Sequence, residues 1–253
     1  MSLGVAITAA RNLIGDLMDG EVNLISGNDG TVLLIETADA VANTVVGNLI
    51  GTNAAATAAL PNLFSGISID GAPDTLIGGS VPEALNLISG NDGAGIVVAN
   101  SGATNTVIIG NFIGTDLTGA LAIPNNGDGV LINQSASSTF VGTGNPGEGN
   151  LISGNDGAGV AIESGAFGNA VFGNLIGGAG ALGNFIGVQI IDADKNQIGE
   201  SIASRRNLIS GNAFAGIVIQ GSSALENSVQ NNLIGTDLLG TTAIPNDYGI
   251  LID

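Results

Sequence analysis

The amino-acid sequence predicts an all-β fold: a right-handed parallel β-helix, or solenoid, of about eight coils with three short strands in each coil. Three observations lead to this prediction. An asparagine-containing block recurs along the chain, the segments between blocks alternate with the two-residue period of a strand, and the composition is unusual. The 253 residues include 42 glycines but only seven phenylalanines, one tyrosine and no tryptophan, which is far from ordinary globular composition.

The repeat is double. The block Asn-Leu-Ile-Ser-Gly-Asn alternates with a second block of the type Gly-Asn-Leu-Ile-Gly-Thr, and both share one asparagine at equivalent positions: Asn23, Asn48, Asn86, Asn111, Asn150, Asn174, Asn207 and Asn232. Short separations of 24–25 residues alternate with long ones of 33–39 residues. We therefore divide a single domain, 1–253, into double-coil repeats at 23–85, 86–149, 150–206 and 207–253. In such a solenoid each coil buries its apolar side only against its neighbours.

The strand assignment follows from segments such as Gly-Ile-Ser-Ile-Asp at 66–70 and Gly-Val-Leu-Ile-Asn at 129–133. Their flanking residues stay apolar while the middle residue varies, so the middle side chain should point outward. The residues expected to face inward are Ile67, Ile69, Val130, Ile132, Val188, Ile190, Ile250 and Ile252. Unequal coil lengths favour a right-handed helix over a left-handed one built on regular hexapeptides. Leucine-rich repeats are disfavoured because their L-x-x-L-x-L pattern is missing.

The recurrent asparagines are expected to form a structural ladder. Asparagine tolerates bends and can hydrogen-bond the backbone there, and stacked carboxamides can satisfy each other at the ~4.8 Å spacing of neighbouring strands. Replacing Asn111 or Asn150 with leucine should therefore destabilise the protein.

The pair Leu-Ile or Phe-Ile follows every ladder asparagine. Because successive side chains of a strand point to opposite faces, one residue of each pair must point outward. The expected outer column is Leu24, Leu49, Leu87, Phe112, Leu151, Leu175, Leu208 and Leu233. We expect the apolar loops that follow, such as 117–123 and 238–244, to fold back over this column. The alternative is an interface with a partner or with a second copy.

Composition excludes several functions. Four basic against 22 acidic residues give a net charge of −18, which argues against a nucleic-acid partner. The absence of cysteine and histidine removes disulfides, thiol nucleophiles and the commonest zinc ligand and general base. No stretch is apolar enough to suggest membrane insertion, and no targeting signal is visible at Met1 to Gly20.

The blocks N-[LF]-I-[SG]-G-N and G-N-[LF]-I-G-T-D-L-T-G, with G-x-[VI]-L-I between them, resemble the Asn/Gly-rich right-handed β-helix repeats of large bacterial surface and secreted proteins, within the pectate-lyase-like superfamily. The resemblance covers about residues 12–253. It implies the fold, but it does not decide activity, because that superfamily includes polysaccharide lyases, hydrolases and epimerases as well as non-catalytic adhesins.

The candidate catalytic residues are the charged side chains that concentrate in the third repeat: Asp192, Asp194, Lys195, Arg205 and Arg206. A lyase acting on acidic sugars needs a base and a cation that stabilises the developing charge, and a hydrolase needs two suitably spaced carboxyl groups. The competing interpretation is that these residues belong to solvated turns.

Metal binding is not expected from the repeated acids Asp29, Asp92 and Asp156, which should lie ~10 Å apart at every second coil. The candidates for a loop-bound calcium ion are Asp116 and Asp237 of the Gly-Thr-Asp-Leu segments, with help from backbone carbonyls. No cofactor is expected.

The sequence thus favours a non-catalytic structural or adhesive β-helix segment of an extracellular or cell-surface bacterial protein, cut from a longer array. The alternative is a polysaccharide-acting enzyme with its site near the third repeat. Expected partners are a polysaccharide or a cell surface, or a second copy through the uncapped ends or the outer Leu/Phe column.

Overall fold

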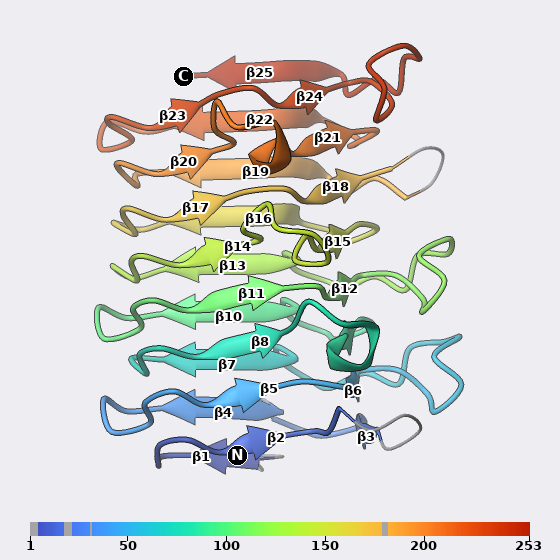
Figure 1. Ribbon diagram of the computed structural model, residues 1–253, viewed down its shortest axis with the longest axis vertical. Helices are drawn as coiled ribbons and strands as arrows, with labels where there is room; N and C mark the ends of the chain where they lie inside the picture. Colours follow the sequence, from blue (N-terminus) through green and yellow to red (C-terminus); the bar gives the residue numbers. More distant parts are fainter. Residues whose placement is uncertain (1–4, 18–21, 31, 179–181) are drawn as a thin grey trace.

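The computed structural model describes residues 5–17, 22–30, 32–178 and 182–253. Over these residues the chain forms 25 β-strands and two single-turn 3₁₀ helices, η1 (Pro82–Ala84) and η2 (Ala203–Arg205). The strands stack into a solenoid that climbs from the N-terminus to the C-terminus. In Figure 1 the nearer strands run to the right and the farther strands to the left as the chain climbs, which is a right-handed coil.

Three parallel sheets make up the walls of the coil. Sheet A has nine strands, namely β1 (Val5–Ile7), β4 (Leu33–Glu36), β7 (Ile67–Asp70), β10 (Ile96–Ala99), β13 (Val130–Asn133), β16 (Ala158–Glu163), β19 (Ile186–Ile191), β22 (Ala215–Gln220) and β25 (Tyr248–Ile252). Sheet B has eight strands, namely β2 (Leu13–Ile14), β5 (Thr44–Val45), β8 (Leu76–Gly78), β11 (Val107–Ile109), β14 (Phe140–Val141), β17 (Ala170–Val171), β20 (Gln197–Ile198) and β23 (Ser228–Val229).

Sheet C also has eight strands, namely β3 (Asn23–Ile25), β6 (Asn48–Ile50), β9 (Leu87–Ile88), β12 (Phe112–Ile113), β15 (Leu151–Ile152), β18 (Leu175–Gly177), β21 (Leu208–Ser210) and β24 (Leu233–Ile234). The chain visits the sheets in the order A, B, C, so each coil contributes one strand to each sheet. Eight complete coils and the ninth strand of sheet A account for all 25 strands, which confirms the predicted fold.

The core is a column of aliphatic side chains inside the coil. Strand pairing places Ile67, Ile96 and Val130 at equivalent positions of successive coils, and all three are fully buried. Six of the eight residues predicted to face inward are buried in this core. The other two, Ile250 and Ile252, are 47% and 72% exposed because β25 is the last strand of sheet A and is covered on one edge only.

The predicted asparagines form one continuous column where sheet B turns into sheet C. Each carboxamide nitrogen donates to the carboxamide oxygen of the next coil over 2.9–3.1 Å, through all eight members from Asn23 to Asn232. We call this column the BC ladder. Its interior members also donate to backbone carbonyls; Asn111, for example, donates to the carbonyls of Ile77 and Ile109. The carboxamides thus satisfy carbonyls that no strand partner reaches at the bend.

A second column, which the sequence analysis missed, lies where sheet C turns into sheet A. We call it the CA ladder, and its eight members are Asn28, Asn62, Asn91, Asn125, Asn155, Asn184, Asn212 and Asn246. The carboxamides are joined over 2.8–3.2 Å in the same way. Each lies four or five residues before the first inward-facing residue of a sheet A strand. This offset, together with the last asparagine of each Asn-Leu-Ile-Ser-Gly-Asn block, is the signal that could have revealed it.

Candidate functional site

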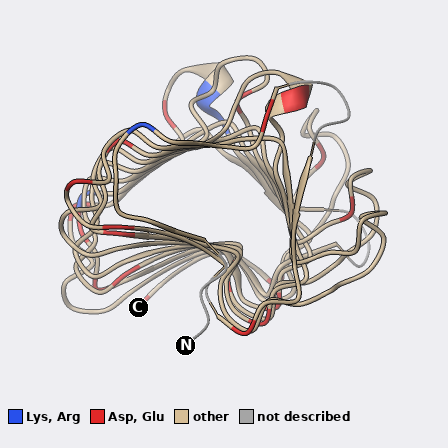
Figure 2. Cartoon of the chain, turned by 90° about the horizontal axis from the view of Figure 1, so that it is seen from below, with Lys and Arg blue, Asp and Glu red and all other residues tan. Residues whose placement is uncertain are grey.

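The charged residues of the third repeat lie in two separate places. Asp192, Asp194 and Lys195 occupy the turn between β19 and β20, whereas Arg205 and Arg206 lie in and just after η2, on the other side of β20. Seen along the coil axis, most acidic and basic residues lie at the turns and loops of the coil (Figure 2). The structure therefore does not bring the predicted acids and bases into one cluster.

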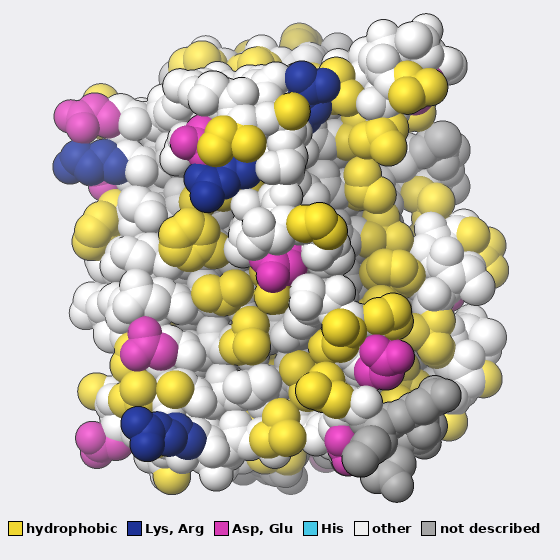
Figure 3. Space-filling view, viewed as in Figure 1, with side chains coloured by type: hydrophobic (Ala, Val, Ile, Leu, Met, Phe, Trp, Pro, Cys, Tyr) yellow, Lys and Arg dark blue, Asp and Glu magenta, His cyan; other side chains and the backbone are white. Residues whose placement is uncertain are grey.

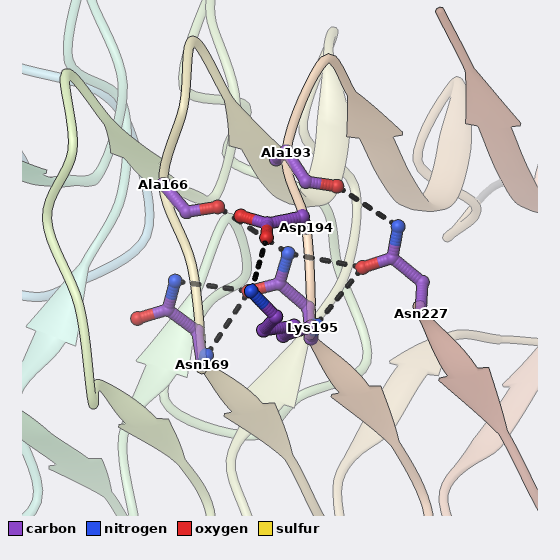
Figure 4. A network of polar contacts seen from close by, with 7 residues as sticks. Ala166, Asn169, Ala193, Asp194, Lys195 and Asn227 are labelled. Carbon is purple, nitrogen blue, oxygen red and sulfur yellow. Dashed lines mark hydrogen bonds and ion pairs between the residues drawn. The ribbon is translucent and has the colours of Figure 1, made fainter. Parts of the chain in front are cut away.

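The turn residues are engaged with their neighbours. The Lys195 Nζ lies 3.1 Å from the Asp194 carboxylate. Figure 4 shows this ion pair beside Asn169 and Asn227, which belong to a short column of hydrogen-bonded asparagines at the turn between sheets A and B. The Asp194 hydrogen bond and the negative charges of Asp194 and Glu226 raise the pKa of Lys195, so it is fully protonated at neutral pH and is a poor general base. Asp192 accepts a hydrogen bond from the backbone N–H of Ser223.

The two arginines are also held by local partners. Arg205 forms an ion pair with Glu200, and its guanidinium lies 5.0 Å from the ring centre of Phe172. Arg206 donates to the backbone carbonyl and to the side-chain oxygen of Asn231 over 3.1 and 2.7 Å. These contacts hold the loop after β20 against the coil before it, through Phe172, and the coil after it, through Asn231.

Asp116 and Asp237 occupy equivalent places at the start of the loops after β12 and β24. Burial alone would raise the pKa of Asp116, but hydrogen bonds from the Thr118 hydroxyl and the N–H groups of Leu121 and Ala120 outweigh it and lower the pKa. Hydrogen bonds from the backbone N–H groups of residues 241 and 242 lower the pKa of Asp237 to about 2. Both carboxylates thus stabilise their own loops. Within the described ranges no three Asp or Glu side chains gather in a way that could hold a metal ion.

A pair of carboxyl groups that the sequence analysis did not single out lies on the outer side of sheet A. Asp128 precedes β13 and accepts a hydrogen bond of 2.7 Å from the N–H of Ala158. Glu163 ends β16 and accepts one of 3.1 Å from the Gln189 carboxamide. Burial raises the pKa of both acids, and the charge of Asp128 raises that of Glu163 further. The register of β13 and β16 places Asp128 level with Ala158 and Glu163 level with Asn133, at opposite ends of the two strands. Carboxyl groups with raised pKa values occur at acid–base sites.

Loops cover only part of the Leu/Phe column. Leu49 and Leu87 are buried under Ala56 from the loop after β6 and Leu85 from the segment after η1. Toward the C-terminus the column is open, and Leu175 is 43% exposed. The expectation that loops cover the column therefore holds for Leu49 and Leu87, but not for Leu24 nearer the N-terminus, which is 45% exposed. No helix of the described ranges is long and apolar enough to cross a membrane.

No family model and no curated protein matches this chain. Among solved structures, it is similar to the periplasmic alginate epimerase AlgG, with a TM-score of 0.54 and 15% identity over 92% of this chain and 50% of that one. It is also similar to the A-module of the mannuronan C-5 epimerase AlgE4 of Azotobacter vinelandii, with a TM-score of 0.50 and 16% identity over 95% and 65% of the two chains. The chain spans about half the length of AlgG. It therefore shares the right-handed β-helix fold with these proteins, as its repeats predict.

Proposed function

We propose that this chain is a rigid, non-catalytic β-helix that serves as a structural or adhesive segment of an extracellular or cell-surface bacterial protein. The observation that supports this most directly is where its basic groups lie. The whole sequence has four Lys and Arg residues, and those of the third repeat are held by Asp194, Glu200 and Asn231. None lies on the outer face of sheet A, where the carboxyl pair is found.

Charge supports the same proposal. An enzyme that removes the C5 proton of an acidic sugar must neutralise the sugar carboxylate and the negative charge that develops in the transition state. The net charge of −18 would instead repel a polyuronate. The repeated residues are used for architecture, because sixteen asparagines form the two complete ladders.

The comparisons support a location outside the cytoplasm and a carbohydrate environment. One structural neighbour is a periplasmic alginate epimerase and the other a mannuronan epimerase. A shared fold transfers no activity, so we take from these neighbours only the kind of molecule they act on. We propose a polysaccharide or a cell surface as the partner of this chain.

The test is to incubate the protein with a panel of uronic-acid polymers, with and without calcium. The readouts are the absorbance of unsaturated product, reducing ends and the epimer ratio by NMR. We expect no turnover. Turnover that is abolished by Lys195→Ala or Arg205→Ala, with the fold intact by circular dichroism, would overturn the proposal.

A second candidate function rests on Asp128 and Glu163. One carboxyl group with a raised pKa can donate a proton to a glycosidic oxygen while the other, ionised, activates water or attacks the sugar. Such a hydrolase would act on a neutral polysaccharide, because the surface charge disfavours an acidic one. The pair lies beside the third repeat, since Glu163 and its partner Gln189 belong to it.

This candidate is tested with a panel of neutral polysaccharides and a reducing-end assay. Glu163→Gln and Asp128→Asn should each abolish any hydrolysis. Glu36→Gln, which removes a carboxyl group at the equivalent end of β4, is the matched control and should not affect it. Absence of hydrolysis by the unmodified protein, or hydrolysis that both variants retain, would eliminate this candidate.

A further inference from the structure

A pocket with one charged residue lies on the outer face of sheet C. Figure 3 shows hydrophobic side chains running along the solenoid on this face, where the Leu/Phe column is open. The insertion that follows β20 and contains η2 lies on one side of the column, and the loop that follows β24 lies on the other. Between them is a pocket of about 310 Å³. Its lining includes Leu175, Leu208 and Leu233 of the column, Ser204 and Arg206 of the insertion, and Leu238 of the loop.

Arg206 is the only charged residue among those that line this pocket, although the chain carries 22 acids and four bases. Lys195 and Arg205 each pair with a carboxylate, but Arg206 pairs with none in the part of the chain that the structure describes. Its Nε and Nη2 groups donate to Asn231, and its Nη1 group has no protein partner among the described residues. This guanidinium is therefore available to an anion from outside the chain.

The guanidinium of Arg206 is already held in place. The Asn231 carboxamide accepts from Arg206 over 2.7 Å and donates to the backbone carbonyl of Glu200 over 3.0 Å. A side chain that is fixed before binding loses little conformational entropy when it binds. Guanidinium N–H groups form strong, charge-assisted hydrogen bonds with carboxylates. The Ser204 hydroxyl, which makes no hydrogen bond to the described residues, is a second donor on the same side of the pocket.

We propose that this pocket binds a small amphiphile that has one carboxylate head group and an unbranched aliphatic chain, such as a medium-chain fatty acid. The carboxylate accepts hydrogen bonds from the Arg206 guanidinium. The aliphatic chain lies over Leu175, Leu208 and Leu233. This binding goes beyond the structural or adhesive function proposed above and does not depend on it.

The charge and the lining of the pocket favour this class of ligand over others. The net charge of −18 repels a polyanion strongly, whereas the repulsion of a single carboxylate is smaller because it scales with the charge of the ligand. A neutral hydrocarbon would leave Arg206 without a partner, and a cationic amphiphile would be repelled by it. An aliphatic chain gains from each methylene that it buries against the three leucines, which a fully hydroxylated ligand does not.

The test is isothermal titration calorimetry of the full chain with sodium octanoate, and with 1-octanol as an uncharged probe of the same length. We expect saturable binding of octanoate and about tenfold weaker binding of octanol, because the alcohol lacks the charge-assisted hydrogen bonds. Arg206→Gln should weaken octanoate binding by about tenfold and leave octanol binding unchanged. Absence of saturable octanoate binding, or equal affinities for the two probes, would overturn the proposal.

Arg11→Gln is the matched control for charge. Arg11 lies on the turn between β1 and β2, far along the solenoid from the pocket, and also has no carboxylate partner among the described residues. Its replacement changes the net charge by the same amount, so octanoate should bind this variant as it binds the unmodified protein. Equal losses in the two variants would show that net charge, and not the pocket, governs binding.

A second pair of variants tests the position of the aliphatic chain and leaves Arg206 intact. Leu238 lines the pocket, whereas the adjacent Leu239 is not among its lining residues, and both are exposed. Leu238→Ser should weaken octanoate binding several-fold, and Leu239→Ser should not change it. Hexanoate should bind about tenfold more weakly than octanoate, because it buries two fewer methylenes. Equal effects of the two serine variants, or equal affinities for hexanoate and octanoate, would contradict a chain held over the leucines.

Discussion

The BC ladder and the turn between sheets A and B perform the same task with different side chains. The BC ladder is an unbroken column of eight asparagines. At the A–B turn, the equivalent column begins with Asn12 and Asn43 and resumes with Asn169, Asn196 and Asn227. Between them stand Thr75, Thr106 and Thr139. The hydroxyl groups of all three threonines are buried without a hydrogen-bond partner in the described structure.

The comparison shows what the carboxamide contributes. An asparagine both accepts from the coil before it and donates to the coil after it and to a nearby carbonyl, so it propagates along the axis. A threonine fills the space of the turn but stops the column. The fold tolerates this interruption because the backbone hydrogen bonds of the flanking strands continue, as those from β8 to β11 and from β11 to β14 do. The sheets therefore set the fold, and the ladders add to its stability.

The largest effect is expected where the ladder is unbroken. Asn111→Leu removes a buried carboxamide that bonds Asn86, Asn150 and two carbonyls, and each buried polar group left unpaired costs about 1–3 kcal/mol. We expect the free energy of unfolding to fall by about 3–5 kcal/mol in urea denaturation. Asn126→Leu, at an exposed position with one bond to Asp92, is the control. Equal losses in the two variants would contradict a buried ladder.

A gain is expected where the ladder is interrupted. Thr139→Asn places a carboxamide beside Asn169, whose side-chain oxygen already accepts from the backbone N–H of residue 139 over 2.9 Å. The added bond, together with the loss of an unpaired hydroxyl, should raise the free energy of unfolding by about 1 kcal/mol. Thermal unfolding gives the readout. A lower melting temperature would mean that the turn is shaped for threonine.

A smaller, pH-dependent effect is expected at the carboxyl pair. Because the folded state raises the pKa of Asp128 and Glu163, folding favours their protonated forms. Stability from these groups is present at low pH and is lost as the pH rises through the raised values. Glu163→Gln should therefore be more stable than the unmodified protein at pH 7, and the difference should shrink near pH 4. A difference that does not change with pH would contradict the raised pKa values.

The smallest effect is expected at Asp237, on the loop after β24. Its pKa is lowered to about 2 in the folded state from 3.8, so the ionised form is favoured and its contribution is present above pH 3.8 and lost as the pH falls through about 2. Asp237→Asn should slightly lower stability at pH 7 and have little effect near pH 2. A loss of equal size at both pH values would show that charge is not the cause.

Much of the fold could be predicted from sequence because the solenoid repeats its local chemistry. Asn86 and Asn111 occur in nearly identical blocks, so the BC ladder was visible. The CA ladder was only half visible. Four of its members are the last asparagine of the Asn-Leu-Ile-Ser-Gly-Asn block, whereas the other four stand in loops whose next residue varies, for example Leu63, Phe185 and Asp247. All eight lie four or five residues before the first inward-facing residue of a sheet A strand, and this becomes evident once the strands are known.

The candidate site could not be predicted in the same way. The acids and bases of the third repeat are close in sequence, but β20 separates Lys195 from Arg205. Asp128 and Glu163 are 35 residues apart in sequence and belong to no repeated block, and their raised pKa values come from burial. Such burial depends on the packing of adjacent coils, which the local sequence pattern does not specify.

The most direct test of the central claim, that stacked carboxamides join successive coils, is hydrogen exchange of the asparagine side chains measured by NMR. The carboxamide protons of Asn86, Asn111 and Asn150 are expected to exchange far more slowly than those of Asn145, which lies on an exposed loop. Exchange of the three ladder residues as fast as that of Asn145 would contradict the account.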